Sequence, residues 1–290
     1  MKHLGANYAS GAWFNRQQLQ AGKKIKSREE VLGALGLDPG RKTAAIFSHI
    51  LYDATFFYGE SQFADYEEWL IETVRAAAAN RNLNWIVKVH PVNVWRSRMD
   101  GHPLEQLEVR ALRAALGELP DHVKVLPADT DINTYSLFST IDYGLTVRGT
   151  IGMELQCFGI PVVTAGTGRY SGRGFTIDPA TPEQYRQVLA HLHEVPGLDD
   201  ESIRLARLYS SATFMLRPLR MEAFMLDFAA RTYGASGLVA NVSVKAARAE
   251  EFESGADIAA FRGWVAGEDA DLLNRRVLAQ PSRRGVEIPA

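Results

Sequence analysis

Residues 142–165, DYGLTVRGTIGMELQCFGIPVVTA, contain one complete strand–helix–strand pattern. Asp142–Val147 is a short apolar run that is typical of a buried strand, and a helical pattern follows over Thr150–Phe158. Gly159 is expected to end that helix, and Pro161–Ala165 is predicted to be the next strand. Strand, helix and strand of these lengths, joined by short loops, predict a parallel βαβ unit.

The same alternation continues on both sides of this unit. The capping-box pattern Ser27-Arg-Glu-Glu30 predicts a short helix before the first strand. Further predicted strands are Thr43–Ser48, Trp85–His90 and Val123–Leu126, and further predicted helices are Phe63–Asn82, Leu104–Leu119, Ile132–Ser139, Pro182–Glu194 and Ser202–Thr232, the last interrupted at Pro218. We therefore expect an α/β fold with a Rossmann-like doubly wound parallel sheet.

Three parts are predicted along the chain. Residues 1–26 are rich in Gly, Asn and Gln, then basic, and indicate a leading segment or linker. Residues 27–232 carry the alternating pattern and are expected to form one α/β domain. Residues 233–290 are more polar and less periodic, which predicts a partly helical C-terminal extension.

The overall composition excludes several classes of protein. The chain has 32 basic and 34 acidic residues in 290, and this balance disfavours broad nucleic-acid binding. Its single cysteine, Cys157, excludes an intrachain disulfide and a cysteine-rich zinc site. Because the sequence has no run of about 18 apolar residues and no apolar leader, we expect a soluble, cytoplasmic protein. Peripheral association with the inner face of the membrane stays open.

Lys88-Val-His90-Pro91 closes a predicted strand with two polar side chains. Side chains alternate along a strand, so Lys88 and His90 are predicted to share one face, with Pro91 ending the strand. Ligands of a doubly wound sheet bind beyond the carboxyl ends of its strands. An ammonium group beside an imidazole suits a phosphate or a carboxylate, although two solvated polar residues at a strand end would give the same pattern.

Arg148, Gly149 and Thr150 follow the strand of the unit quoted above and lead into its helix. Gly149 would let a ligand approach the backbone, and the helix start would offer N–H groups to an anion. Glu154 lies one helical turn after Thr150, where a carboxylate could hold ribose hydroxyls. The alternative is that Glu154 is a surface residue, but its apolar neighbours favour a buried helix.

The nine residues 166–174, GTGRYSGRG, contain four glycines and two arginines directly after a predicted strand. They indicate a mobile, anion-seeking loop, with Gly166, Arg169, Tyr170 and Arg173 as candidate ligand contacts. The spacing is neither the G-x-G-x-x-G fingerprint nor a Walker loop, so neither dinucleotide nor ATP binding is indicated. A plain flexible surface loop would have the same composition.

His49 and Asp53 follow the first predicted strand and are the candidate catalytic pair. Asp53 could act as a base or a nucleophile, and His49 could orient it or titrate near neutral pH. His191 and His193 are two apart in a predicted helix and therefore face different directions. The sequence accordingly predicts no metal site.

Taken in order, these clusters resemble the capsule polysaccharide synthesis proteins, bacterial glycosyltransferases that include the Kdo (3-deoxy-manno-octulosonic acid) transferases. That family shows Q-x-x-x-D, then K-x-H-P, then T-x-G-x-E, G-x-P-V and Y-x-G-x-G-x-T. The matching stretches here are His49-x-x-x-Asp53, Lys88-Val-His90-Pro91, Thr150-Ile-Gly152-Met-Glu154, Gly159-Ile-Pro161-Val162 and Tyr170-Ser-Gly172-Arg-Gly174 with Thr176. One departure is His49, where the family has glutamine.

The resemblance implies the donor-binding, C-terminal half of a GT-B glycosyltransferase, with no catalytic metal. It would place Lys88 and His90 at the donor phosphate, Thr150 and Glu154 at the nucleotide, and Asp53 in catalysis. Only one Rossmann-like unit is visible, so the acceptor-binding half is expected from a separate N-terminal domain or a partner subunit.

The resulting hypothesis is a glycosyltransferase of surface or capsular polysaccharide synthesis, acting on a glycan or glycolipid acceptor. Its expected donor is a CMP-linked acidic sugar such as CMP-Kdo, because Arg169 and Arg173 would suit the carboxylate of the sugar. No further cofactor is expected. One alternative is a transferase of polyol phosphate from a CDP carrier. Another is a non-catalytic module that binds nucleotide or glycan and regulates a partner synthase.

Overall fold

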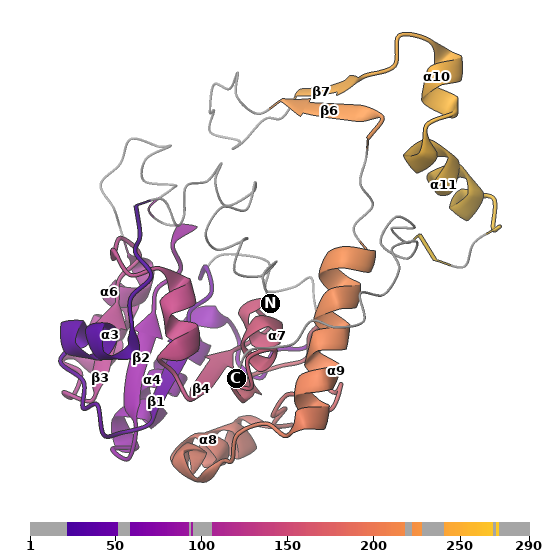
Figure 1. The fold of residues 1–290 in the computed structure, drawn as a ribbon. Helices are drawn as coiled ribbons and strands as arrows, with labels where there is room; N and C mark the ends of the chain where they lie inside the picture. Colours follow the sequence, from indigo (N-terminus) through magenta and orange to yellow (C-terminus); the bar gives the residue numbers. More distant parts are fainter. Residues whose placement is uncertain are drawn as a thin grey trace. The chain divides into compact units, whose positions relative to one another are not determined.

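The computed structural model describes residues 22–51, 59–92, 94, 106–217, 222–227, 241–268 and 271–272. The chain divides into two compact units, Met1–Arg207 and Leu208–Ala290. Figure 1 shows their elements, coloured along the sequence.

The first unit is built on a five-stranded parallel sheet. Its strands, in the spatial order β3-β2-β1-β4-β5, are Val123–Leu126, Asn84–Lys88, Thr43–Phe47, Tyr143–Thr146 and Val162–Thr164. The predicted doubly wound, Rossmann-like α/β fold is therefore confirmed.

Helices cover both faces of this sheet. The helices of the first unit are α3 (Arg28–Leu35), α4 (Tyr66–Ala79), α6 (Leu107–Leu116), the 3-10 helix η1 (Thr134–Ser139), α7 (Ile151–Gln156), α8 (Pro182–Ala190), the 3-10 helix η2 (Leu192–Glu194) and most of α9 (Asp200–Ser211). Ala44 and Ile46 of β1 pack with α4, α6 and α8, whereas Ala45 and Phe47 pack with α3, η1 and α7. Alternate side chains of one buried strand thus serve two separate cores.

The sheet changes direction between β1 and β4. From β1 the chain moves outward through α4 to β2 and through α6 to β3, and η1 then returns it to the other side of β1. Right-handed crossovers in opposite directions place their helices on opposite faces. The loops after β1 and β4 therefore diverge, and doubly wound sheets bind ligands beyond the carboxyl ends of two such strands. We call this region of the first unit the crevice.

The predicted elements of the first unit are present, with ends shifted by a few residues. The Ser27 hydroxyl accepts the Glu30 N–H and the Glu30 carboxylate accepts the Ser27 N–H, so the predicted capping box is confirmed. Lys24 and Lys26 hold the chain before this helix against the loop after β3. Lys24 pairs with Ile132 through the backbone, and the Lys26 ammonium lies 2.7 Å from the Asp131 carboxylate.

The helix predicted over Ser202–Thr232 is wrong in its second half. Beyond α9 and the π-helical turn Ala212–Leu216, the chain forms β6 (Phe224–Asp227), which pairs antiparallel with β7 (Asn241–Val244). The strand partner lies outside the local window on which a periodicity prediction rests, so the prediction failed here.

The second unit joins this hairpin to α10 (Ala249–Glu253) and α11 (Ala256–Val265). Phe224 meets Phe252 edge to face, with ring centroids 5.7 Å apart. The Asp257 carboxylate accepts the Ala223 N–H at 2.8 Å, so one side chain of α11 fixes the start of β6. Within the described part of the chain, we find no helix that is long and apolar enough to cross a membrane.

Tyr170 packs against the first turn of α7. Its side chain is 1% exposed, and its hydroxyl donates to the Gly149 carbonyl at 2.7 Å. A Cβ atom at Gly152 would lie 2.1 Å from the Tyr170 hydroxyl. Glycine at 152 is therefore required for the loop after β5 to close over the loop after β4.

We expect Gly152→Ala to destabilise the first unit by about 1–3 kcal/mol, because the added methyl must displace a buried tyrosine. Gly33→Ala in α3 is the matched control, since its Cβ would meet nothing within 4 Å. Chemical denaturation should show little change or a gain of up to about 1 kcal/mol for the control. Equal stability of both variants would contradict this account.

We expect the β6–β7 hairpin to depend on the charge of Asp257. Burial raises its pKa, but bonds from the backbone N–H groups of residues 222, 223, 257 and 258 outweigh burial and leave the pKa below its usual value. The carboxylate therefore stabilises the fold at neutral pH, and this contribution is lost as the pH falls through the lowered pKa. In the full chain at pH about 7, Asp257→Asn should speed amide exchange in β6, whereas Glu253→Gln should not.

Candidate functional site

The candidate site is the crevice at the carboxyl ends of β1 and β4, with the flanking ends of β2 and β5. His49 lies two residues past β1, and Arg148, Gly149 and Thr150 follow β4. His90 lies two residues past β2, and Gly166 two past β5. The topology thus brings to one sheet edge all the described residues that the sequence singled out.

The His49 imidazole faces the end of β4. Its Nε2 accepts the Val147 N–H at 3.1 Å and lies 3.0 Å from the Thr146 hydroxyl. Because Nε2 accepts a backbone N–H, the ring proton is on Nδ1 and Thr146 is the donor. The Thr146 hydroxyl in turn accepts the Gly149 N–H at 3.2 Å. One imidazole and one hydroxyl thereby fix the turn after β4.

The surroundings of His49 hold it neutral. The pKa of His49 is lowered to about 3, mainly by burial, and the charge of Arg148 and any charge on His90 act in the same direction. The ring stacks on Tyr66 with a centroid distance of 4.3 Å and meets the edge of Trp69 at 5.6 Å. The sequence had allowed His49 to titrate near neutral pH. In the structure it does not.

His90 sits beside His49 across the sheet edge. Phe47 and Lys88 are the last partners in the β1–β2 register, and beyond them the His90 N–H donates to the Ser48 hydroxyl at 2.9 Å. The His90 Nδ1 accepts the Val92 N–H at 3.2 Å, which leaves the proton on Nε2. Burial lowers its pKa to about 4, with a further contribution from the charge of Lys88. His90 therefore presents a neutral N–H donor.

Lys88 is buried, at 3% exposure, and its ammonium donates to the Val89 carbonyl at 2.7 Å. Its pKa is lowered to about 7, mainly by burial and in part by the charge of Lys23, while Glu108 opposes the shift. These two neighbours come from the residues before α3 and from α6, so Lys88 belongs to a charged cluster on the β2–β3 side. Its charge also acts on His90, so Lys88 lies within electrostatic reach of the candidate site.

Arg148 lies beneath a short strap formed by residues 59–62. Its guanidinium donates to the Gly59 carbonyl at 3.4 Å and to the Ser61 hydroxyl. The strap pairs with the residues after β5. The Gln62 N–H donates to the Ala165 carbonyl at 3.1 Å, and Ser61 forms an isolated antiparallel β-bridge with Gly166. A Cβ at Gly166 would lie 2.4 Å from the Glu60 carbonyl oxygen, so this close pairing requires glycine.

The glycine-rich loop 166–174 is ordered around one carboxylate. Asp178 accepts hydrogen bonds from the Thr164 hydroxyl at 2.7 Å, the Gly172 N–H at 2.8 Å and the Thr176 hydroxyl at 2.7 Å. Tyr170 points inward to α7, whereas Arg169 and Arg173 are exposed. The loop therefore presents two guanidinium groups on a defined turn.

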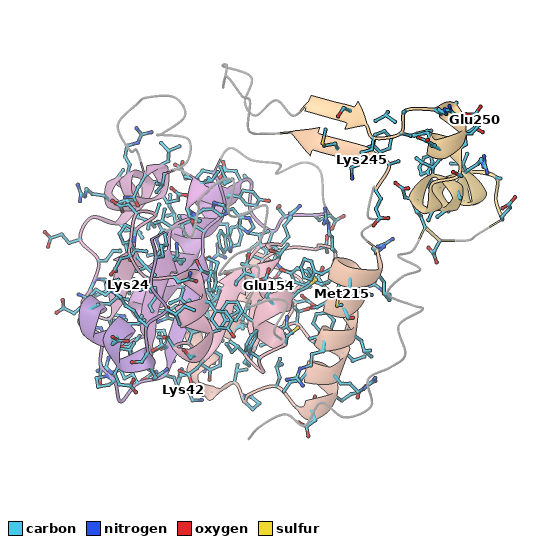
Figure 2. The ribbon with its side chains drawn as sticks, turned by 45° about the horizontal axis from the view of Figure 1, so that its top comes forward. Lys24, Lys42, Glu154, Met215, Lys245 and Glu250 are labelled. Carbon is cyan, nitrogen blue, oxygen red and sulfur yellow. The ribbon has the colours of Figure 1, made fainter. Side chains whose placement is uncertain are left out.

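Thr150 and Glu154 lie at the start of α7. Thr150 is exposed, and its side chain does not cap the helix. Glu154 is 6% exposed, as its apolar neighbours predicted (Figure 2). Burial is the main cause of the raised pKa of Tyr170, and the charges of Asp178 and Glu154 add to it. Glu154 thus lies below the surface, within electrostatic reach of Tyr170.

Asp53, the predicted catalytic carboxylate, lies outside the described residues. Among the residues that are described, no group of three or more His, Cys, Asp or Glu side chains could hold a metal ion.

Thr146 and Asp178 are site residues that the sequence analysis missed. Thr146 could have been found from its place at the end of a strand, directly before the loop with Arg148. No local signal marks Asp178, because its Thr164 partner is 14 residues away in sequence.

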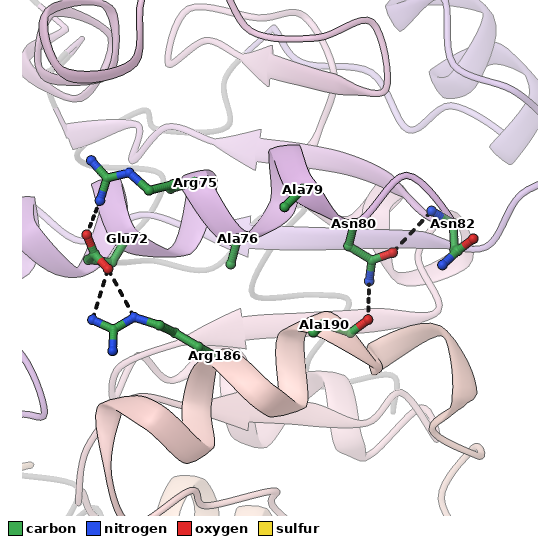
Figure 3. A pocket seen from close by; sticks show the side chains of 8 residues that line it. All are labelled: Glu72, Arg75, Ala76, Ala79, Asn80, Asn82, Arg186 and Ala190. Carbon is green, nitrogen blue, oxygen red and sulfur yellow. Dashed lines mark hydrogen bonds and ion pairs between the residues drawn. The ribbon is translucent and has the colours of Figure 1, made fainter.

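A separate surface pocket of about 390 Å³ lies between α4 and α8 (Figure 3). Glu72 there pairs with Arg75 and with Arg186, the latter at 3.0 Å. Exposed ion pairs of this kind contribute little, and the pocket contains none of the predicted site residues. The ion pair of Glu72 with Arg186 joins α4 to α8.

Polar groups at the crevice can bind oxyanions. His90 contributes a neutral N–H, Arg148 a guanidinium, and the loop after β5 two exposed arginines. Arginine and N–H donors suit phosphate and carboxylate oxygens.

Neither the protein-family models nor the curated proteins contain a match to this sequence. Solved structures with a similar fold include the UDP-GlcNAc 2-epimerase from Neisseria meningitidis bound to UDP-GlcNAc, at 14% identity, with 62% of this chain and 42% of that one covered and a TM-score of 0.41. The wall teichoic acid polymerase TagF matches at 10% identity, over 68% and 43% of the two chains, with a TM-score of 0.38.

The β-Kdo 2,7-transferase KpsC from Thermosulfurimonas dismutans matches at 19% identity, over 62% of this chain and 60% of that one, with a TM-score of 0.34. The chain spans less than half the length of the epimerases that it matches. At these identities and TM-scores, none of the likenesses assigns a function to the chain.

Proposed function

We propose that the crevice between β1 and β4 binds the phosphate groups of a nucleotide-sugar, and that the chain is the donor-binding part of a glycosyltransferase. The observation that carries the proposal is that His90 and Arg148, from two separate strand ends, both lie within electrostatic reach of His49 at the switch point of the sheet. The His90 N–H comes from the end of β2 and the Arg148 guanidinium from the end of β4. Doubly wound sheets bind ligands at this place.

The proposed donor is a CMP-linked acidic sugar such as CMP-Kdo. An acidic sugar carries a carboxylate in addition to the nucleotide phosphate, so it requires two anion-binding regions. The crevice supplies one, and the exposed Arg169 and Arg173 on the loop after β5 supply the other. Bidentate arginine–carboxylate pairing would favour this donor over a neutral sugar.

In this proposal a sugar-transfer transition state develops positive charge on the sugar and negative charge on the leaving phosphate. His90 and Arg148 would stabilise the leaving group, and Asp53 would act as the base. The acceptor, a surface glycan or glycolipid, would be bound by a separate N-terminal domain or partner subunit at the inner face of the membrane.

A second candidate is a non-catalytic module that binds nucleotide or glycan and regulates a partner synthase. What favours it is that the described residues form one doubly wound sheet. Such a module would need the crevice but no base.

Calorimetric titration with CMP, CDP, UDP and GDP tests the binding site. We expect a cytidine nucleotide to bind, and His90→Ala to weaken that binding by more than about tenfold, or roughly 1.4 kcal/mol, because an N–H donor is lost. His191→Ala is the control, since the His191 side chain is 70% exposed on the far end of α8. No binding by any of the four nucleotides would contradict the proposed site.

Release of CMP from CMP-Kdo separates the enzyme from the regulatory module. We expect the chain, mixed with candidate acceptors and partner domains, to release CMP, and Asp53→Asn to reduce that rate by about 100-fold or more, as loss of a general base does. Nucleotide binding should be nearly unchanged in the variant. Binding without any release under all these conditions would favour the module.

A further inference from the structure

The side chain of His49 continues the pairing of β1 with β4 where the backbone ladder stops. The last partners in the register are Ile46 and Leu145. Beyond them, the Val147 N–H donates to the His49 Nε2 rather than to a backbone carbonyl. Val147 is 2% exposed, so its N–H needs a partner inside the protein.

We propose that His49 is a positioning residue of the crevice, whose Nε2 holds the turn Val147–Gly149 in the conformation that presents Arg148 to a ligand, and that His49 does not itself act as a base. The inference rests on the proposed function for its ligand. The turn geometry itself can be tested without any ligand.

The hydrogen bonds of the turn depend on one acceptor. His49 Nε2 accepts a hydrogen bond from the Val147 N–H and another from the Thr146 hydroxyl at 3.0 Å. That hydroxyl is oriented to accept the Gly149 N–H at 3.2 Å. Arg148 lies between these two anchored N–H groups, so its backbone direction depends on the imidazole.

Packing fixes the ring so that Nε2 cannot turn away. His49 stacks on Tyr66 at an interplanar angle of 18° and meets Trp69 at 72°. The titratable and charged groups that act on it are His90 and Arg148, and together with burial, the largest cause, they lower its pKa to about 3. To accept a proton at Nε2, His49 would have to give up the Val147 N–H. Base chemistry and the observed turn are therefore incompatible.

Two substitutions separate the acceptor from the ring. His49→Gln keeps an acceptor oxygen at the end of a side chain of similar reach but cannot act as a base. His49→Phe keeps an aromatic ring against Tyr66 but has no acceptor. His122→Gln is the matched control. His122 lies directly before β3, at the amino ends of the strands and away from the crevice, and its Nε2 lies 3.2 Å from the Ala77 carbonyl.

The experiment combines amide exchange at Val147 and Gly149 with titration of the nucleotide that the wild type binds most tightly. For His49→Phe we expect exchange faster by about tenfold or more at both amides, and affinity lower by about tenfold. His49→Gln should stay within about threefold of the wild type in both measurements, and the control should match the wild type. Amides in β1 and β2 report whether each variant is folded.

Three results would overturn the proposal. Equal impairment of the Gln and Phe variants would show that the imidazole itself is required. Unchanged amide protection in the Phe variant would show that Nε2 does not hold the turn. A nitrogen NMR spectrum with the proton on the His49 Nε2, between about pH 6 and 8, would contradict the tautomer. If the wild type binds no nucleotide, the proposed function fails, while amide exchange and the tautomer still test the turn.

Discussion

The central strand β1, residues Thr43–Phe47, is the constraint on which the first unit depends. It is hydrogen-bonded to β2 on one side and to β4 on the other, and all five of its residues are buried. A strand without an exposed face needs a helical layer on each side, which the two separate cores provide. Because the chain leaves β1 in one direction and returns on the other side, the crevice at its carboxyl end follows from the topology.

Polar side chains at the carboxyl end of the sheet are held by backbone groups as well as by one another. The two imidazoles each accept a main-chain N–H, and Arg148 donates to the Gly59 carbonyl. Burial lowers the pKa of both histidines, so the proposed anion binding would depend on N–H donors and guanidinium groups rather than on imidazolium charge. Such fixed donors need no reorganisation when a ligand arrives.

Much of the fold could be predicted, because strands with two buried faces and capped helices leave local patterns. The strand Thr43–Phe47 and the capping box at Ser27 are examples. The strand Phe224–Asp227 was missed because its partner is distant in sequence. At the site, alternation predicted that Lys88 and His90 share a face. The strand ends at Lys88, however, and the Lys88 ammonium bonds to the Val89 carbonyl in a cluster with Glu108.

In the first unit, the sequence by itself determined which residues form strands and helices and which polar residues stand at the strand ends, since these properties depend on neighbours along the chain. Only the tertiary structure decided which of those polar groups meet. His49 and Thr146 are 97 residues apart, and nothing local to either predicts their 3.0 Å contact. The tautomers and charge states of His49 and His90 were also decided by the tertiary structure, because they depend on burial and on the direction of the hydrogen bonds that each ring receives.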